Sequence, residues 1–556
     1  MVPKKLTDRL SVSPQIALTD MKQIKSLGFG TIISNRPDGE GSDQPTFAEI
    51  QDAAKKAGLK AVHVPVTAGA LTDDDVAAMQ SAVTEADGRV LAFCRTGTRS
   101  ATLWAINEGR DGTAVPTILQ IGKQAGYDLS GAARRIAAGN GSASDTPDVT
   151  HDILIIGAGA AGIATAASLK ARRADLDIAI IDPSEAHYYQ PGWTLVGAGV
   201  FTPEQTARAT AHLIPKGVEW IKAAVVAFEP EKNCVIVEGC RVIGYKRLIV
   251  APGLKLDWHG VEGLTETLGR NGVTSNYRYD LAPYTWKLVQ GLNSGRAVFS
   301  QPPMPIKCAG APQKAMYLSA DHWQRTGVLD KIDIEFRNAG AVLFGVKEYV
   351  PALMKYVERY GIDLKFNETL KSVDGAAKTA VFAVKDADGN VRDETVEFDM
   401  LHAVPPQTAP DFIRVSPIAN EAGWVDVDQA TLRHLKFDNI WALGDACGAP
   451  NAKTAAAARK QAPVVAHNIV ADIDGGSAVA HYDGYGSCPL TVERGKIVLA
   501  EFGYGGKLLP SFPKWVIDGT KPSRAAWFLK EKMLPPIYWK AMLKGREYMA
   551  HPDTTG

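Results

Sequence analysis

The stretch that most constrains this fold runs from residue 151 to residue 190 and reads HDILIIGAGAAGIATAASLKARRADLDIAIIDPSEAHYYQ. An apolar run at Ile153–Ile156 is short enough for one buried strand, and an alanine-rich helical pattern follows it. Between them lie Gly157, Gly159 and Gly162 in the spacing G-x-G-x-x-G. A second apolar run, Ile178–Ile181, ends in Asp182. The order strand, glycines, helix, strand and acid predicts a dinucleotide site, whereas an isolated glycine motif would be a weak signal.

Each part of this unit has a task. The first glycine makes a tight turn, the second lets the backbone approach a pyrophosphate, and the third lets helix and strand pack closely. Asp182 can accept a hydrogen bond from a ribose hydroxyl. An acid at this position favours an unphosphorylated adenosine ribose, as in FAD or NAD. The alternative is an ordinary βαβ unit without a ligand.

The composition is that of an ordinary globular protein with two or more domains. The chain has 556 residues, of which 46% are hydrophobic and 22% charged. Lys+Arg and Asp+Glu both number 61, so no net field attracts nucleic acid. Six cysteines fit a reducing compartment or a redox role better than a disulfide scaffold. The start lacks the apolar core of a secretory signal, and no apolar stretch is long enough to span a bilayer.

We expect an α/β chain of several domains. A small domain at 1–137 and a Gly/Ser/Asp-rich linker at 138–150 precede tandem Rossmann-like domains. These are an FAD-binding domain at 151–295 and 401–480, a second Rossmann-like domain at 296–400, and a C-terminal region with an aromatic tail at 481–556.

The second Rossmann-like domain lacks a glycine fingerprint. Its first strand, at 296–300, is followed by QPPMPIKCAGAPQK at 301–314. Prolines remove N–H donors and fix φ, so this loop cannot cradle a pyrophosphate with backbone amides. We therefore expect no NAD(P)H site, and the loop carries Cys308 instead.

Two further strand ends are suited to an FAD cofactor. The strand at 247–253 ends in Ala-Pro-Gly, where the backbone can lie close to a cofactor. The strand NIWALGD ends in Gly444 and Asp445, and Lys453 and Thr454 lead into an alanine-rich helix. That turn suits the ribityl or phosphate portion of FAD, and it contains Cys447.

Cys308 and Cys447 each lie in a Gly/Pro-rich turn before a helical pattern. A helix N-terminus lowers a thiol pKa, and the thiolate is the reactive form. If the two converge on a flavin they form a redox-active disulfide; otherwise they are unrelated structural thiols. We interpret Cys234 and Cys240 as small buried hydrophobes and Cys488 as structural, and we predict no metal site.

Residues 151–556 resemble the sulfide:quinone oxidoreductases found in mitochondria and many bacteria. The resemblance is carried by GAGAAG, YYQPGWTLVGAG (188–199), PIKCAGAPQK (305–314), GWVDVD, GDA-C…PNAKTAAA, YDGYGSCPL (482–490) and PPIYWKAMLKG (535–545). It implies non-covalent FAD, with a persulfide on Cys447 and a thiolate on Cys308 that donates to the flavin. It also implies electrostatic help from Lys314, which could instead be a surface lysine. In the mitochondrial form the second cysteine directly follows Gly-Asp, whereas Ala446 intervenes here.

The resemblance implies oxidation of hydrogen sulfide, with electrons passed to ubiquinone or another membrane quinone. The sulfane sulfur would leave to a thiol, to sulfite or to further sulfide. The expected location is peripheral, on the cytoplasmic side of a bacterial inner membrane, and a homo-oligomer is left open. The aromatic tail at 524–545 would contact the membrane surface, with its lysines Lys530, Lys532, Lys540 and Lys544 meeting anionic headgroups. The expected FAD contacts are Gly157, Ala158, Gly159, Ala160, Ala161, Gly162, Asp182, Gln190, Val226, Ala251, Gly253, Gly444, Asp445, Lys453 and Thr454.

The N-terminal domain carries CRTGTRS at 94–100 after an apolar strand. Cys94 and Arg99 frame a short loop that leads to a helix, which makes an anion cradle with a nucleophile at its base. The Cys-x4-Arg spacing resembles the rhodanese loop, and the domain resembles the phosphatase-like domain of beta-lactamase-hydrolase-like proteins. We expect Cys94 to relay sulfane sulfur. The alternatives for the whole chain are a type II NADH:quinone dehydrogenase-like flavoprotein and a phosphatase fused to a flavin redox sensor.

Overall fold

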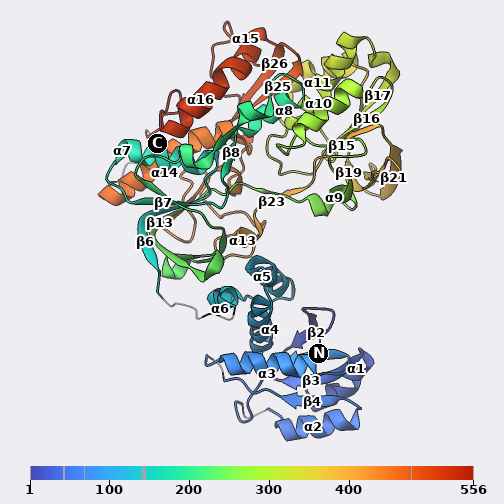
Figure 1. Ribbon diagram of the computed structural model, residues 1–556, viewed down its shortest axis with the longest axis vertical. Coiled ribbons are helices and arrows are strands. Elements are labelled where there is room, and N and C mark those ends of the chain that lie inside the picture. Colours follow the sequence, from blue (N-terminus) through green and yellow to red (C-terminus); the bar gives the residue numbers. More distant parts are fainter. Residues whose placement is uncertain are drawn as a thin grey trace. The chain divides into compact units, whose positions relative to one another are not determined.

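The computed structural model describes residues 2–41, 44–67, 69–139, 141, 146–476 and 479–554. The chain divides into two compact units (Figure 1). The first comprises Met1–Thr150, Ala223–Tyr245 and Asp411–Ala419, and the second comprises His151–Lys222, Lys246–Pro410 and Asn420–Gly556. Part of the predicted linker, Asn140 and residues 142–145, lies outside the described residues.

The first unit is built on a five-stranded sheet of order β1-β2-β5-β3-β4. Its strands are β1 (Lys4–Lys5), β2 (Leu10–Ser13), β3 (Phe29–Ser34), β4 (Lys60–His63) and β5 (Arg89–Phe93), and only β1 and β2 pair antiparallel. Its helices are α1 (Met21–Ser26), α2 (Phe47–Lys56), α3 (Asp73–Thr84), α4 (Thr98–Arg110), α5 (Val115–Gln124), α6 (Ala133–Ala138) and α13 (Asp411–Arg414). The antiparallel hairpin of β11 (Val225–Glu229) and β12 (Cys234–Val237) also belongs to this unit.

The first sheet of the second unit has the order β10-β7-β6-β13, with β24 beside β13. Its strands are β6 (Val149–Ile156), β7 (Ile178–Ile181), β10 (Val218–Ile221), β13 (Val242–Val250) and β24 (Ile440–Ala442). Residues Ile153 to Ile156 and all of β7 are buried, as expected of parallel strands covered on both faces. Helix α7 (Ala160–Arg172) follows the glycine motif and packs against α14 (Ala455–Asp474). The predicted dinucleotide-binding fold is confirmed.

A second parallel sheet has the order β15-β22-β16-β17-β18. It contains β15 (Val273–Thr274), β16 (Gly295–Gln301), β17 (Ile332–Asn338), β18 (Asp363–Phe366) and β22 (Met400–His402). The loop after β16 leads into α11 (Ala311–Thr326). Along the chain, α10 (Ala282–Gly291) lies between β15 and β16, and α12 (Val350–Arg359) lies between β17 and β18. An antiparallel meander of β19 (Glu368–Asp374), β20 (Thr379–Lys385) and β21 (Val391–Glu397) completes this half.

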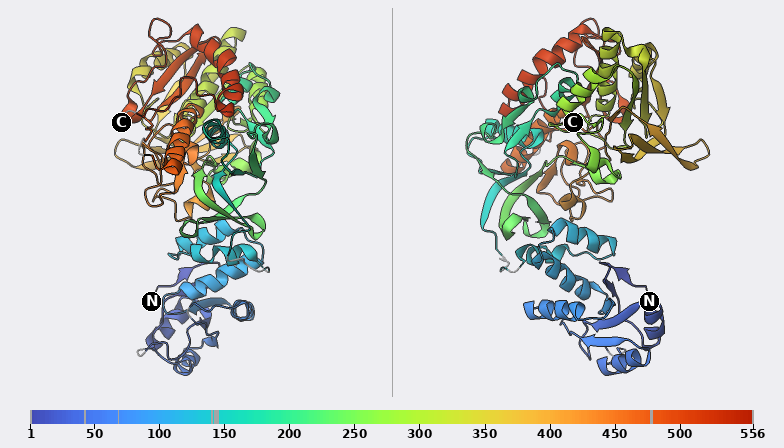
Figure 2. Two further views of the ribbon diagram at one scale, coloured as in Figure 1. Left: turned by 90° about the vertical axis from the view of Figure 1, so that its left-hand side faces the viewer. Right: turned by 45° about the vertical axis from the view of Figure 1, so that its right-hand side comes forward.

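The C-terminal region packs into this second half. The hairpin β25 (Gly486–Glu493) and β26 (Lys496–Phe502) shares one buried cluster with Phe299 and Trp323. The chain then forms α15 (Arg524–Phe528), a π-helical turn at Leu529–Met533 and α16 (Leu534–Lys540). Figure 2 shows these last elements, in red, along the outside of the second unit. Among the helices that the structure describes, none is long and apolar enough to cross a bilayer.

Candidate functional site

The glycine motif forms the turn between β6 and α7 as the sequence predicts. Gly157 has φ +101°, and a Cβ there would lie 2.5 Å from the Ala251 carbonyl oxygen. A Cβ on Gly162 would lie 1.9 Å from the Gly157 carbonyl oxygen, so only glycine permits this close packing. A Cβ on Gly159 would meet nothing within 4 Å, because this residue faces a cavity. The Asp182 carboxylate accepts hydrogen bonds from the N–H groups of Ala158 and Ser184, both at 2.7 Å.

The cavity has a volume of about 470 Å³ and lies entirely in the second unit. Most of the predicted contacts line it: Ala158, Gly159, Ala160, Ala161, Asp182, Gln190, Ala251, Gly253, Gly444, Asp445, Lys453 and Thr454. Gly157 and Gly162 do not line it, because they serve the packing behind the turn. Val226 does not line it either. It lies on β11 and packs against the core of the first unit, so the expected contact at Val226 is not seen.

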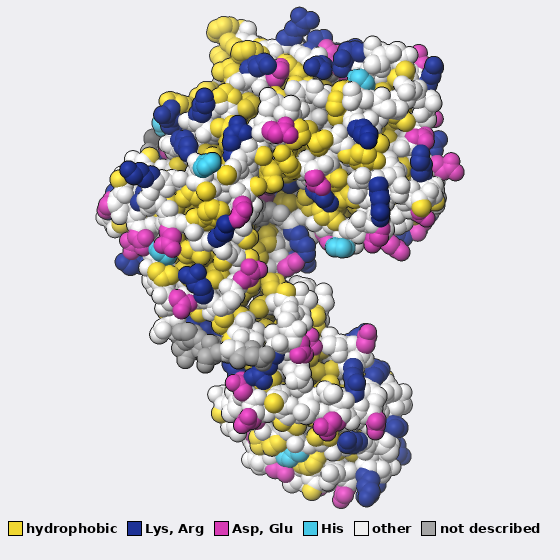
Figure 3. Space-filling model, in the orientation of Figure 1, with side chains coloured by type: hydrophobic (Ala, Val, Ile, Leu, Met, Phe, Trp, Pro, Cys, Tyr) yellow, Lys and Arg dark blue, Asp and Glu magenta, His cyan; other side chains and the backbone are white. Residues whose placement is uncertain are grey.

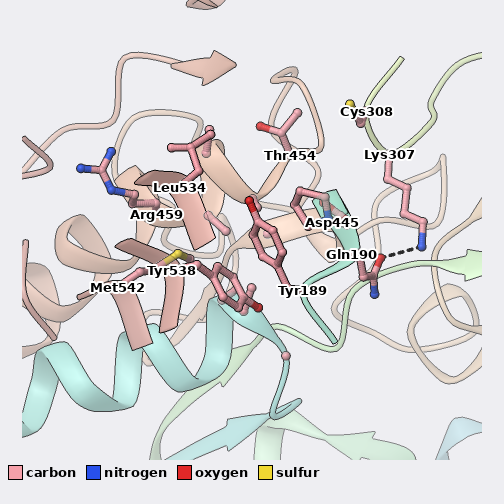
Figure 4. A pocket seen from close by; sticks show the side chains of 18 of the residues that line it. Tyr189, Gln190, Lys307, Cys308, Asp445, Thr454, Arg459, Leu534, Tyr538 and Met542 are labelled. Atoms are coloured by element: carbon pink, nitrogen blue, oxygen red, sulfur yellow. Dashed lines mark hydrogen bonds between the residues drawn. The ribbon is translucent and has the colours of Figure 1, made fainter. Parts of the chain in front are cut away.

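Lysines surround the polar part of this cavity. The Lys307 ammonium donates to Gln190 Oε1 at 2.8 Å (Figure 4), and burial lowers the pKa of Lys307 to about 8. Lys453 donates to the carbonyl oxygens of Asp445 and Cys447 at 2.8 and 2.9 Å. Burial raises the pKa of Asp445, and Lys453 and Lys307 partly offset that effect. Thr454 caps α14 by accepting from Ala457 N–H at 3.1 Å. The wall is therefore suited to an anionic, hydrogen-bonding cofactor.

Cys308 lies on the cavity wall, in the loop before α11. Its backbone is left-handed, with φ +51°. Lys314 is buried, and its ammonium donates to Cys308 Sγ at 3.1 Å, so the reading of Lys314 as a surface lysine is wrong. A hydrogen bond from Cys488 and the nearby lysines hold the pKa of Cys308 well below its usual range. These contacts favour the thiolate form of Cys308.

The neighbour of the Cys308 thiol is Cys488. Their Sγ atoms lie 3.2 Å apart. Cys447 is fully buried, and its Sγ accepts from Ala449 N–H at 3.4 Å. In the part of the chain that the structure describes, no hydrogen bond joins the thiols of Cys308 and Cys447. The thiol contact predicted for Cys447 is thus made by Cys488, because β25 places residue 488 against the loop before α11.

The C-terminal segment closes one side of the cavity with Leu529, Leu534, Ile537, Tyr538 and Met542. The Tyr538 hydroxyl lies 2.6 Å from His187 Nε2, and His187 Nδ1 lies 2.9 Å from the Ala158 carbonyl oxygen. Burial lowers the pKa of His187. A neutral imidazole can donate from Nδ1 to the Ala158 carbonyl oxygen and accept from the Tyr538 hydroxyl at Nε2. These two hydrogen bonds connect the C-terminal segment to the glycine turn.

Lys530 was expected at a membrane surface, and that expectation is wrong. Its side chain is buried and donates to the Pro191 carbonyl oxygen at 3.3 Å. Burial, together with repulsion from Lys314, lowers the pKa of Lys530 to about 7, while Cys308 opposes the shift. Lys532, Lys540 and Lys544 are exposed, as expected. Sequence pattern alone did not identify Lys530 because it stands among the same aromatic residues as the exposed lysines.

In the first unit, the loop from Cys94 to Arg99 joins β5 to α4. Gly97, at φ +91°, donates its N–H to Cys94 Sγ at 3.1 Å. Arg99 donates to Glu40 at 2.7 Å and to the Val66 carbonyl oxygen at 2.5 Å. Arg36 donates to the same Glu40 carboxylate oxygen at 2.7 Å. The loop is assembled as predicted, but Glu40 neutralises part of its positive charge.

Two family models and several known proteins match parts of this chain. Residues 3–110 match the family model for the beta-lactamase hydrolase-like protein, phosphatase-like domain, and residues 151–289 match that for pyridine nucleotide-disulphide oxidoreductases. The mitochondrial sulfide:quinone oxidoreductase of Dictyostelium discoideum is 42% identical over 397 residues, covering 71% of this chain and 86% of that protein. The chain belongs to the sulfide:quinone oxidoreductase family. The crystal structure of the Aquifex aeolicus sulfide:quinone oxidoreductase shares the fold, with a TM-score of 0.60 at 21% identity, covering 73% of this chain and 98% of that one.

The N-terminal residues have different relatives. The beta-lactamase hydrolase-like protein of Agrobacterium fabrum is 35% identical over 131 residues, which cover 23% of this chain and 30% of that protein. The sulfide:quinone oxidoreductase family accounts for the rest and identifies FAD as the cofactor. The cavity fits FAD: Gly159 leaves room for a pyrophosphate, the Asp182 carboxylate on the cavity wall could accept from a ribose hydroxyl, and lysines supply positive charge.

Proposed function

We propose that this chain oxidises hydrogen sulfide and passes the two electrons to a membrane quinone. The observation that carries the proposal is the contact of the Lys314 ammonium with the Cys308 sulfur on the wall of the dinucleotide cavity, which favours the thiolate. A thiolate is the form that exchanges with sulfur compounds. When bound, FAD supplies the two-electron chemistry that links a thiolate to a quinone.

The protein's own residues set the state of the thiol and exclude competing reactions. Lys314 stabilises the Cys308 thiolate each time it is released. Leu534, Ile537 and Met542 close the cavity with apolar side chains, which limits water at the reacting sulfur. A small sulfur acceptor, whether a thiol, sulfite or further sulfide, would then remove the sulfane sulfur.

NADH is not a substrate under this proposal. Pro312 lies in the first turn of α11, and three amides of the preceding loop already have partners within the chain. Lys307 N–H donates to Gln407 Oε1 at 2.8 Å, Cys308 N–H to the Lys453 carbonyl oxygen at 2.9 Å, and Ala311 N–H to the Cys308 carbonyl oxygen at 2.7 Å. A pyrophosphate would find no free amide cradle there.

Anaerobic titration of the FAD-loaded protein distinguishes the two reductants. Stoichiometric sulfide should bleach the flavin absorbance, and quinone should restore it. NADH should leave the absorbance unchanged. Rapid bleaching by NADH without sulfide would favour a type II NADH dehydrogenase.

For the N-terminal unit, we propose that Cys94 accepts sulfane sulfur as a persulfide. The Gly97 N–H at 3.1 Å stabilises a sulfur anion at this position. The Glu40 carboxylate, held against Arg99, would repel a phosphate dianion more than a singly charged persulfide. A phosphatase is the second candidate, because residues 3–110 match a phosphatase-like domain.

We also propose that the C-terminal region contacts a membrane surface, on the cytoplasmic side of a bacterial inner membrane. Trp515, Phe528 and Met533 are 88%, 57% and 44% exposed, and exposed lysines stand close to them in sequence. Figure 3 shows hydrophobic and basic side chains together over the region of α15 and α16. This combination is suited to an interface with anionic lipid.

A further inference from the structure

Arg36, in the first unit, is a buried cation that the Cys94 loop alone does not explain. Its Nε donates to Glu40 Oε2 at 2.7 Å, and its Nη1 donates to Gln15 Oε1 at 3.0 Å. Arginine is almost never fully buried unless it is paired, because removing its charge from water is costly. The position of Arg36 relative to the Cys94 loop suggests what this cation is for.

The carboxyl ends of parallel strands bring Arg36 and the Cys94 loop together. Strands β2, β5, β3 and β4 pair in parallel. Cys94 directly follows β5, and Arg36 follows β3 by two residues. The two strand ends are joined by a hydrogen bond from Asn35 N–H to the Phe93 carbonyl oxygen at 2.8 Å. This edge of a parallel sheet is where α/β proteins bind their ligands.

Glu40 occupies the point at which two guanidinium groups meet. Arg99, at the end of the Cys94 loop, donates from Nη2 to Glu40 Oε2 at 2.7 Å, and Arg36 donates to the same oxygen. The hydrogen bond from Arg99, helped by that from Arg36, lowers the pKa of Glu40 against the opposing effect of burial. Each guanidinium is a planar fork with several N–H donors, more than one carboxylate oxygen can accept. The carboxylate thus stands where a larger anion could be held.

The Cys94 thiol is closed off in this arrangement. Cys94 is 0% exposed, and its sulfur accepts from Gly97 N–H at 3.1 Å. A Cβ on Gly97 would lie 2.2 Å from the Tyr127 hydroxyl oxygen, so Tyr127 covers the loop on that side. A sulfur compound therefore reaches the thiol only after a side chain around the loop has moved.

Glu40 is the side chain best placed to move. It stands between two glycines in the sequence, and its side chain is 23% exposed, compared with 8% for Arg36 and 14% for Arg99. Both arginines have a second anchor. Arg36 is held by Gln15, and Arg99 donates to the Val66 carbonyl oxygen at 2.5 Å. If Glu40 left, both guanidinium groups would keep their positions.

We propose that Arg36 and Arg99 form a binding subsite for the anionic group of the sulfur compound that reacts at Cys94, and that Glu40 fills this subsite until the compound displaces it. This proposal rests on the proposed sulfur relay by Cys94. The ligand is a small compound that carries a sulfur atom and an oxygen-bearing anionic group. Two guanidinium forks bind such a group through several charge-assisted hydrogen bonds. The displacement exchanges one anion for another and changes no covalent bond.

Phosphorus NMR of inorganic phosphate, added to the FAD-loaded full-length protein, tests the subsite without sulfur chemistry. Glu40→Gln removes the competing charge, so phosphate should bind about tenfold more tightly, or better, as measured from its line width. Asp38→Asn is the matched control, because this carboxylate of the same loop accepts from Phe47 N–H at 2.8 Å. It should leave the phosphate affinity unchanged. Equal affinities of wild type and Glu40→Gln, or an equal rise in Asp38→Asn, would overturn the proposal.

A double variant tests the second guanidinium. Arg36→Lys in the Glu40→Gln background keeps the positive charge but removes the planar fork. The gain in phosphate affinity should therefore be lost. Phosphate binding as tight as in Glu40→Gln alone would show that Arg36 is not part of the subsite, and the proposal fails.

The kinetics of exchange with thiosulfate separate the subsite from the proposed relay. In Glu40→Gln the KM for thiosulfate should fall about tenfold while kcat stays nearly constant, because the variant no longer has to displace a carboxylate before binding. An unchanged KM contradicts the subsite. If phosphate binds more tightly to Glu40→Gln but no form of the protein exchanges sulfur at Cys94, the subsite is supported and the proposed relay fails.

Discussion

Replacing Lys314 by methionine should raise the pKa of Cys308 and slow every step that releases its thiolate. The ammonium lies 3.1 Å from the sulfur. At an effective dielectric constant of about 20, two unit charges at that distance attract by roughly 5 kcal/mol, equal to about 4 pKa units. The hydrogen bond from Cys488 persists in the variant, and the missing cation also removes its own desolvation cost. We therefore expect a rise of about 1–3 units.

The assay is the pH dependence of alkylation at Cys308, followed by mass spectrometry on the FAD-loaded protein. The thiolate alone reacts, so the pH midpoint of the rate reports the pKa. Each unit of increase lowers the thiolate fraction about tenfold at a pH below the midpoint. Lys307→Met is the matched control, because it removes a cavity-wall cation that donates to Gln190 instead of Cys308. An unchanged midpoint in Lys314→Met would refute the electrostatic account of the thiolate.

Three further predictions follow from the site and the surface. Burial lowers the pKa of Lys530 to about 7, so the lysine is charged below that pH, where it favours the Cys308 thiolate, and loses the charge above it. Lys530→Met should therefore remove a step near pH 7 from the pH profile of Cys308 alkylation. A step that remains in the variant counts against this role. In the full-length protein, sulfide turnover should place an added sulfur on Cys94. Cys94→Ala should stop the exchange of sulfane sulfur with thiosulfate while flavin reduction continues. Hydrolysis of an aryl phosphate, without an added sulfur on Cys94, favours the phosphatase. The double variant Phe528→Ser/Met533→Ser should weaken co-sedimentation with anionic liposomes. The control Val391→Ser should not, because the Val391 side chain is 63% exposed but lies outside the C-terminal region. Equal binding by the two variants contradicts the proposed membrane contact.

The spacing of residues in the sequence predicted those parts of the fold that a few consecutive residues determine. The glycine turn, Asp182 and the Gly444–Asp445 strand end lie where the pattern indicates, because each is set by a few consecutive residues. The likeness to sulfide:quinone oxidoreductases identified the family, which the comparison confirms.

Contacts between distant segments could not be predicted in this way. Cys308 and Cys488 are 180 residues apart, and their contact depends on how β25 packs against the loop before α11. A pattern of cysteines in turns selects Cys447 and passes over a cysteine inside a strand. Val226 shows the reverse error, since its strand is adjacent in sequence to the dinucleotide unit but packs in the first unit.

The C-terminal turn connects the surface and the thiol site. Phe528 and Met533 are exposed, while Leu529 and Lys530 between them are buried, with Leu529 and Lys530 lining the cavity that also holds Cys308. A π-helical turn at Leu529–Met533 sets this division between outward and inward side chains. Because the same turn carries both faces, a displacement at the surface would also move the cation that lies near the Cys308 thiolate. The segment that we propose to contact a membrane is therefore part of the wall of the cavity that holds Cys308, and its removal would disturb both.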